Sequence, residues 1–510
     1  MTAPPPEAPR QTTGDRARLA SFLKNRRSRP AAERDGIPTR SPNQLVEATE
    51  AQQQIWLHAE LAQAPLYNEP ITIHYDGELD VAAFERAFNA VLDRHEAWRT
   101  SFEWRDGKLM QIVADHLTVT LPVNDLRSLP SRKREAAALN AAREDSKRPF
   151  ALDQLPLFRG RLCRMADDRY RFYLTLQHII FDGVSLYRIF LPELQAFYKA
   201  FHSGTVLLLP PLERQFADFA LHSQLRAAED REQLIKYWTG VLSRPAPPLA
   251  LPFDFPRPVV RSFAGEMAKF ALSRTMTASL KEVGERGSAT LFMTLLAAYH
   301  VLLYSYTGAC DQPVGTATSS RKHELTQGML GLFLNTVVLR SSFSREETFV
   351  DLLAKVRETV VGALMHDDIS FGELVTLFEK NRVPGLNPLF QLMFSLEPPL
   401  SPLEPGWRFT QMDVETSLSK YDLHLEMDER EDELIGRFIY SVELFREQTI
   451  EELKARWLRL LDLISKNPLW TIEQLAAQSQ EANSAEISAR SFWQQARNLF
   501  RKAQVGLSVL

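Results

Sequence analysis

The stretch LTLQHIIFDGVSL, residues 174–186, combines a histidine with an Asp-Gly turn at the end of an apolar, strand-like run. His178 is followed closely by Asp182 and Gly183. An imidazole is the side chain used most often to remove a proton near neutral pH. An aspartate in the turn can fold back to accept hydrogen bonds or an arginine, and a glycine permits a close backbone approach. The stretch therefore predicts either a reactive histidine at a strand end or a core histidine followed by an ordinary turn.

The elements around this stretch alternate between strands and helices. Residues 157–165 and 169–180 are joined by two aspartates and predict a β-hairpin that ends at the histidine. Residues 184–201 follow as an amphipathic helix, and apolar residues at helical spacing predict another helix over 80–102. A strand holds a side chain more rigidly than a loop does, which suits a group that must act with precision.

The order of elements predicts an α/β protein of two similarly built lobes. A proline-rich stretch, residues 244–258, interrupts the chain near its middle, and the pattern beyond it echoes the first half. A chain of 510 residues also exceeds what one hydrophobic core usually supports. The expected division is a mostly disordered lead-in (1–46), an N-terminal lobe with the histidine (47–225), a C-terminal lobe (226–468) and a helical tail (469–510) that packs on the body or meets a partner.

Composition excludes several classes of protein. A formal charge of −4 gives no basic excess for nucleic acid. Two distant cysteines, Cys163 and Cys310, suit a reducing compartment and no disulfide scaffold. The N-terminus has no apolar core of a secretory signal. Residues 287–310 lack charge, but they carry polar side chains at helical spacing and predict a buried core helix, not a membrane span. We expect a cytoplasmic protein.

A set of motifs makes the chain resemble a known family. QHIIFDGVS is similar to the HHxxxDG motif of condensation domains from non-ribosomal peptide synthetases, in the chloramphenicol-acetyltransferase-like superfamily. The other motifs that resemble the family follow in its order: TEAQQQIWL (49–57), RHEAWRTSF (94–102), FADFA (216–220), GLFLNTVVLR (331–340), HDDISFGELV (366–375) and LNPLFQLMFSL (386–396). Together they cover about residues 47 to 465. Gln177 departs from the family by replacing the first histidine, and Val383, Gly385 and Leu386 depart from the last motif.

The resemblance implies two lobes in a V with a tunnel that reaches His178 from both ends. One carrier protein would deliver an acyl thioester on a phosphopantetheine arm, and an amine or hydroxyl acceptor would arrive at the other mouth. His178 would remove or position the proton of the attacking group, which requires the neutral ring. No bound cofactor and no metal are expected.

The resemblance also assigns supporting roles around the histidine. Asp182 would be structural and pair with an arginine, for which Arg99 is preferred over Arg94. Gly183 would keep the tunnel open and could offer its N–H to the oxyanion. Ser185 could do the same more weakly.

Other marked residues have ordinary explanations. Asn335 would either fix the tunnel floor from the second lobe or satisfy buried backbone groups. His366, beside Asp367 and Asp368, is interpreted as structural instead of as part of a metal cluster, and His424 is assigned no chemistry.

Three functions stay open. The preferred hypothesis is a free-standing, monomeric condensation enzyme that acts on acyl or peptidyl carrier proteins supplied in trans and forms an amide or an ester. The alternatives are a coenzyme A-dependent acyltransferase and a non-catalytic module that docks carriers or a tailoring enzyme. The intact His178 disfavours the docking module, because members of that kind typically lose the motif histidine.

Overall fold

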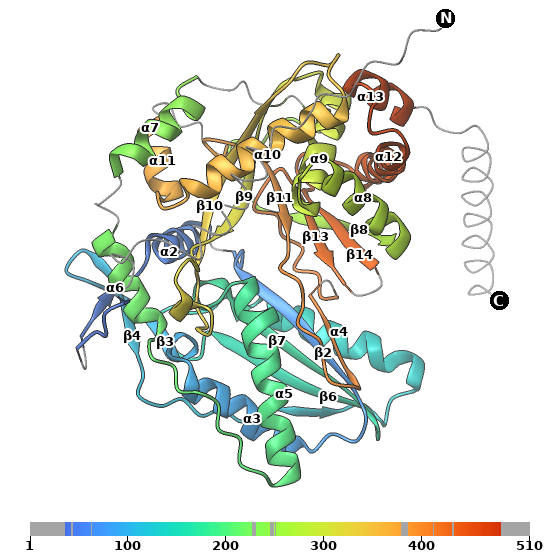
Figure 1. Cartoon of the computed structure of the whole chain (residues 1–510). Coiled ribbons are helices and arrows are strands. Elements are labelled where there is room, and N and C mark those ends of the chain that lie inside the picture. Colours follow the sequence, from blue (N-terminus) through green and yellow to red (C-terminus); the bar gives the residue numbers. More distant parts are fainter. Residues whose placement is uncertain are drawn as a thin grey trace, which may run out of the picture.

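The computed structural model describes residues 36–480, apart from residues 42–43, 63, 227–230, 245–248, 250, 379–385, 412 and 431–432. Over this range the chain forms two lobes, each with its own sheet and its own apolar core (Figure 1). Residues 1–35 of the predicted lead-in and residues 481–510 of the predicted tail lie outside the described residues.

The N-terminal lobe contains a five-stranded sheet in the order β12-β2-β7-β6-β5. Its strands are β2 (Asn68–Asp76), β5 (Val123–Asp125), β6 (Phe158–Ala166), β7 (Arg169–Gln177) and β12 (Trp407–Thr410). Helix α4 (Ser131–Lys147) contacts one face, while α3 (Val81–Arg94) and α5 (Leu191–Ser203) pack together on the other. The predicted hairpin is confirmed as β6 and β7.

Strand β7 is buried on both faces because helices cover the sheet on either side. Phe172 packs against Phe84 and Phe88 of α3, with ring centroids 5.1 and 5.6 Å apart. Tyr173, the next residue along the strand, belongs to the small core under α4. Because side chains alternate between the two faces of the sheet along β7, the strand sets the direction in which the chain presents His178 at its end.

The helix predicted over 80–102 is shorter than expected. It ends at Arg94, and a 3-10 turn (Glu96–Arg99) leads into β3 (Thr100–Arg105). His95 breaks the helix with an extended backbone, φ −118° and ψ 111°. Its buried ring contacts Glu193 of α5 at 2.7 Å, so tertiary contacts outweigh the local helical pattern.

The remaining elements of the first half of the chain lie outside the five-stranded sheet. They are β1 (Val46–Glu47), β4 (Lys108–Val113), α2 (Glu50–Ala62), α6 (Phe216–Arg226) and α7 (Arg231–Leu242). Strands β1, β4 and β3 form a small antiparallel sheet. Part of the predicted lead-in is packed: Ile37 is fully buried, and the Arg40 backbone donates to Asp218 at 2.9 Å.

The C-terminal lobe contains a six-stranded sheet in the order β10-β9-β11-β13-β14-β8. Its strands are β8 (Gly265–Ser273), β9 (Asp311–Ser319), β10 (Leu334–Ser342), β11 (Leu392–Leu396), β13 (Leu423–Glu429) and β14 (Glu433–Ser441). Its helices are α8 (Arg274–Arg286), α9 (Leu291–Thr307), α10 (Phe349–Met365), α11 (Phe371–Phe378), α12 (Glu447–Lys466) and α13 (Ile472–Gln480). Helix α13 contacts α9 and α12, so this part of the predicted tail packs on the body.

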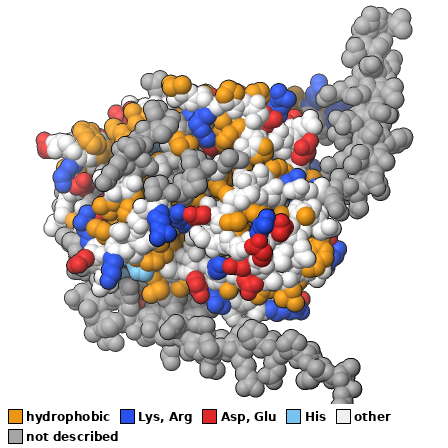
Figure 2. All heavy atoms as spheres, turned by 90° about the horizontal axis from the view of Figure 1, so that it is seen from above, with side chains coloured by type: hydrophobic (Ala, Val, Ile, Leu, Met, Phe, Trp, Pro, Cys, Tyr) orange, Lys and Arg blue, Asp and Glu red, His pale blue; other side chains and the backbone are white. Residues whose placement is uncertain are grey.

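Helix α9 accounts for the long uncharged run. Most of its length is buried in the C-terminal core, as predicted, and Thr290 caps its first turn by accepting from the backbone of Met293. Among the described residues, no single helix has both the length and the apolar character needed to cross a bilayer. On the face seen in Figure 2, acidic and basic side chains intermingle with apolar ones.

Two segments cross between the lobes and correct the predicted boundary. Met329, Leu330 and Phe333 come from the connection between β9 and β10, yet they pack in the N-terminal core. Strand β12 also lies beyond the predicted boundary, but it pairs with β2, with Phe409 opposite Ile73. The N-terminal lobe is therefore completed by residues from the second half of the chain.

Candidate active site

The histidine singled out by its spacing lies in a tight turn directly after β7. His178 opens a 3-10 turn (His178–Ile180), and its backbone N–H donates to Tyr67 O at 2.8 Å. Gln177, the departure from the family motif, is buried, and its Oε1 accepts from Ile179 N at 3.0 Å. The glutamine thus caps the turn that carries His178, which explains how the chain accommodates it.

The contacts of the His178 ring define its tautomer. Nδ1 lies 3.1 Å from the carbonyl oxygen of Phe181. A carbonyl can only accept, so Nδ1 carries the hydrogen and Nε2 presents a lone pair. No described residue bonds Nε2, and the side chain is only partly buried. The ring also stacks on Phe181 with centroids 4.8 Å apart, so a basic nitrogen is held in a fixed direction.

The surroundings of His178 keep it neutral. Burial lowers its pKa, and the nearby Lys420 lowers it further, while Glu69 acts in the opposite direction. Lys420 donates to Glu69 at 3.2 Å, which partly cancels both charges. A neutral ring with a free Nε2 can accept a proton at physiological pH.

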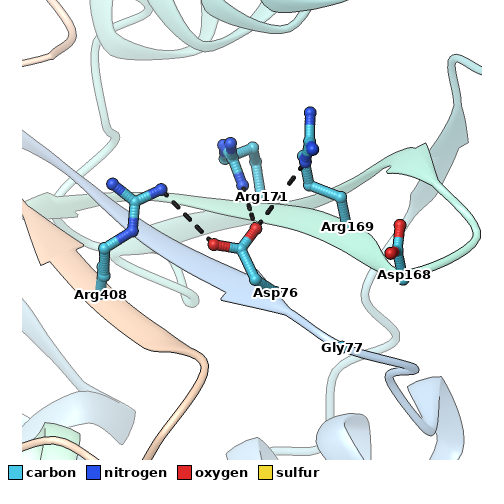
Figure 3. A pocket seen from close by; sticks show the side chains of 6 residues that line it. All are labelled: Asp76, Gly77, Asp168, Arg169, Arg171 and Arg408. Atoms are coloured by element: carbon cyan, nitrogen blue, oxygen red, sulfur yellow. Dashed lines mark ion pairs between the residues drawn. The ribbon is translucent and has the colours of Figure 1, made fainter.

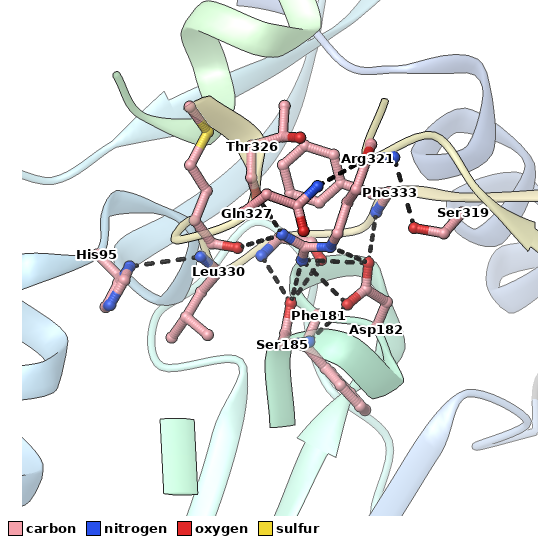
Figure 4. Close-up of polar contacts among 12 residues, drawn as sticks. His95, Phe181, Asp182, Ser185, Ser319, Arg321, Thr326, Gln327, Leu330 and Phe333 are labelled. Carbon is pink, nitrogen blue, oxygen red and sulfur yellow. Dashed lines mark hydrogen bonds and ion pairs between the residues drawn. The ribbon is translucent and has the colours of Figure 1, made fainter. Parts of the chain in front are cut away.

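Asp182 is fully buried and binds the β9–β10 connection, which crosses from the second half of the chain into the N-terminal lobe (Figure 4). Its Oδ1 accepts from Ser185 N at 2.7 Å and from the Arg321 guanidinium at 3.0 Å. Its Oδ2 accepts from Phe333 N at 3.1 Å. Arg321 in turn donates to Thr326 O at 2.6 Å. Asp182 is therefore fully paired with buried groups, and its partners from the second half of the chain come from the β9–β10 connection.

The predicted arginine partner is wrong. Arg99 bonds the backbone oxygen of Ala114, and Arg94 reaches Glu193 at 3.0 Å, so neither contacts Asp182. Both arginines are engaged by groups of the N-terminal lobe itself. Arg321 lies in an irregular connection, where helical or strand periodicity gives no signal. The length of that connection between two paired strands was the available clue, since long loops often carry function.

Ser185 does not have the oxyanion role predicted for it, whereas Gly183 keeps an N–H without a described acceptor. Ser185 is fully buried; its hydroxyl donates to Gly331 O at 3.0 Å and accepts from Gly331 N at 3.1 Å, so it cannot face an oxyanion. Gly183 opens the helix that leads into α5, and no described group accepts its N–H. The space beside the Gly183 Cα is filled, because a Cβ built on Gly183 would lie 2.7 Å from Glu397 Oε2.

Asn335 satisfies backbone groups within its own lobe. Its Nδ2 donates to Asp367 O at 2.8 Å and Ile369 O at 2.7 Å, which fixes the segment before α11 to β10. His366 stacks on Tyr237 at 3.9 Å, and Asp367 pairs with Lys322 at 2.6 Å. Across the part of the chain that the structure describes, no group of His, Cys, Asp and Glu side chains is placed to hold a metal ion.

Sequence reasoning missed a polar face of the C-terminal sheet. The register pairs Ser395 of β11 with Glu426 of β13, and Glu426 with Arg437 of β14. His424 and Asp428 share that face of β13 by alternation, while Leu423, Leu425 and Met427 enter the core. The alternation of polar and apolar residues in LHLEMDE was the available clue to this polar face, because the polar side chains of a buried strand must find partners on neighbouring strands.

A surface pocket of about 540 Å³ lies at the other end of the N-terminal sheet (Figure 3). Asp76 lies 3.8 Å from both Arg169 and Arg171 and 3.6 Å from Arg408. Arg169 begins β7, whereas His178 follows its end, so the pocket is separate from the candidate site. Its lining contains charged groups but no neutral base.

Comparisons with known proteins agree with these observations. The family described as Condensation domain matches residues 43–485. One polypeptide of the linear gramicidin synthase from Brevibacillus parabrevis is 40% identical over 437 residues, which are 84% of this chain and 8% of that protein. Phosphinothricin tripeptide synthetase PhsC from Streptomyces viridochromogenes is 36% identical over 83% of this chain and 40% of its own length. The chain thus spans less than half the length of these relatives.

Solved structures show the same fold. The first condensation domain of the calcium-dependent antibiotic synthetase superposes with a TM-score of 0.74 at 21% identity, covering 85% of this chain and 99% of that one. The X-domain of teicoplanin biosynthesis, in its complex with OxyB, gives 0.72 at 26% identity over 86% and 97% of the two chains. With the family motifs, the two-lobed fold and the turn that holds His178, these matches show that the chain belongs to the condensation domain family.

Proposed function

We propose that this chain transfers an acyl group from the phosphopantetheine thioester of a carrier protein to an amine or hydroxyl acceptor. The observation that carries the proposal is the state of His178: a neutral ring, an Nδ1–H directed at Phe181 O, and an Nε2 free of any described partner. A group in that state is suited to accept a proton from an attacking nucleophile.

The reaction can be written with these groups in stated roles. The acceptor nitrogen or oxygen attacks the thioester carbonyl carbon as its proton passes to His178 Nε2. The carbonyl oxygen becomes an oxyanion, for which the free Gly183 N–H is the proposed donor. The C–S bond then breaks, the thiolate takes the proton from His178, and an amide or ester and a free thiol result.

A coenzyme A-dependent transfer uses the same base and differs only in the donor. Intact-mass measurement distinguishes them: the protein is incubated with an acceptor and with either an acyl-carrier thioester or the matching acyl-coenzyme A. Transfer from the carrier and none from coenzyme A supports the proposal, and carriers added as separate proteins test delivery in trans. Efficient transfer from coenzyme A alone contradicts it.

A second candidate is recruitment of a partner enzyme, favoured by the likeness to the X-domain, which was solved in complex with OxyB. The intact His178 with its free Nε2 weighs against it. Replacing His178 by Ala distinguishes the two functions, because a docking module keeps its full function without the imidazole.

A further inference from the structure

Glu397 follows β11 directly and reaches across to the turn that carries His178. Its backbone N–H donates to Met427 O at 2.8 Å, which extends the pairing of β11 with β13. Its Oε2 lies 2.7 Å from the position that a Cβ on Gly183 would take. The carboxyl group therefore lies against the catalytic turn, on the polar face of the C-terminal sheet.

Each acid around Glu397 has a basic partner. Glu426 lies 2.6 Å from Arg437, Asp428 pairs with Arg430, and Glu69 lies 3.2 Å from Lys420. These pairs use the bases that face Glu397. Its own carboxyl group forms no hydrogen bond or ion pair among the described residues.

The same arrangement disfavours a negative charge on Glu397. Burial raises its pKa well above the usual carboxyl range, and Glu426 and Asp428 raise it further. Asp428, in the same cluster, has a pKa raised by burial to about 7. The carboxyl is nevertheless only partly buried, so a ligand can reach it. A cation at that point would supply the missing counterion and favour the ionised form.

We propose that Glu397 forms a subsite for a positively charged group, an ammonium or guanidinium, on the substrate bound beside His178. The inference rests on the proposed acyl transfer, and the cation belongs either to the acyl donor or to the acceptor. Glu397 is then a specificity-determining residue, because a substrate of equal shape without the charge leaves it without a partner.

Matched substrates test this directly. Lysyl and 2-aminoheptanoyl groups have the same length and differ in the terminal charge, and each is placed once on the donor thioester and once on the acceptor. We expect wild-type kcat/KM to favour the charged member by about tenfold or more at one position, since only the ammonium can form a charge-assisted hydrogen bond with the Glu397 carboxylate. Glu397→Gln removes this preference. Glu404→Gln, at an exposed site where Glu404 lies 3.2 Å from Lys199, keeps it.

Equal kcat/KM for both members in the wild type, or a preference that survives Glu397→Gln, overturns the inference. A second measurement does not depend on turnover: calorimetry of n-hexylammonium binding in two buffers of different ionisation enthalpy. Binding to the wild type with proton release, lost in Glu397→Gln, supports the subsite, and absence of binding overturns it. If the wild type transfers no acyl group at all, the proposed function fails and this calorimetry alone decides the subsite.

Discussion

The turn after β7 has two sides that differ in how completely their polar groups are paired. On one side Asp182 and Ser185 are fully buried, and their side chains bond the β9–β10 connection, which crosses into this lobe from the second half of the chain. On the other side His178 Nε2 and the Glu397 carboxyl have no described partner and are partly exposed.

This difference in pairing separates the residues that stabilise the turn from the residue proposed to act on the substrate. A buried, fully paired charge is costly to disturb, so the Asp182 side fixes the position of the turn. An unpaired polar group at a reachable surface is free to bind a substrate, so the His178 side can react. His178 and Asp182 belong to one sequence motif. Only the hydrogen bonds seen in the structure distinguish the residue that supports the turn from the residue that is free to meet a substrate.

The largest effect on the reactive side comes from His178→Ala. We expect acyl transfer to fall roughly 10²–10⁴-fold, because the proton acceptor is lost. Thermal unfolding falls only slightly, since the ring makes one hydrogen bond, to Phe181 O, and one stacking contact, with Phe181. Steady-state kinetics and circular dichroism are the measurements, with His202→Ala on the exposed surface of α5 as control. Retained turnover would remove His178 from the mechanism.

The largest effect on the supporting side comes from Asp182→Ala. Removing one partner of the buried pair leaves Arg321 uncompensated and costs about 3–5 kcal/mol of unfolding free energy. Urea denaturation measures it. Adding Arg321→Met to Asp182→Ala should destabilise by less than the sum of the single changes. Asp167→Ala, at an exposed surface pair, is the control and changes little. A stable but slow Asp182→Ala would contradict a structural role.

Gly183→Ala tests the close contact between the turn after β7 and the Glu397 carboxyl group. The new methyl would lie 2.7 Å from Glu397 Oε2 and 3.2 Å from Pro398 Cδ, so the flexible glutamate must move. We expect stability to fall by less than the loss in Asp182→Ala, and the preference for charged substrates to weaken. Kinetics with the matched lysyl and 2-aminoheptanoyl pairs measure this. A preference as strong as in the wild type would show that Glu397 need not lie against the turn.

The smallest effect is expected from Lys420→Met. The proposed reaction needs the neutral imidazole, so we expect the rate to fall as the pH drops below the pKa of His178. Lys420 lowers that pKa, and its removal raises it, so the acid limb of the kcat/KM profile moves to higher pH. Lys199→Met, at an exposed position, leaves the profile unchanged. A shift to lower pH, or none, would contradict the electrostatic role of Lys420.

Local sequence pattern was sufficient to place His178 at a strand end but not to find the residues around it. The hairpin, the position of His178 at a strand end and the two lobes follow from periodicity and motif spacing, and the structure has all three. Arg321 was missed because it pairs across the lobes from a segment without periodicity. Glu397 was missed because its neighbours are set by strand register, which a single strand cannot reveal.

The strand β12 has a consequence for how the chain folds. It covers one edge of the N-terminal sheet by pairing with β2, although the two are separated by most of the protein. Until residue 410 has left the ribosome, the backbone groups along that edge of β2 lack these partners. Open edges attract other chains. A nascent chain therefore carries an edge prone to association for most of its synthesis, and a fragment that stops near residue 225 should aggregate.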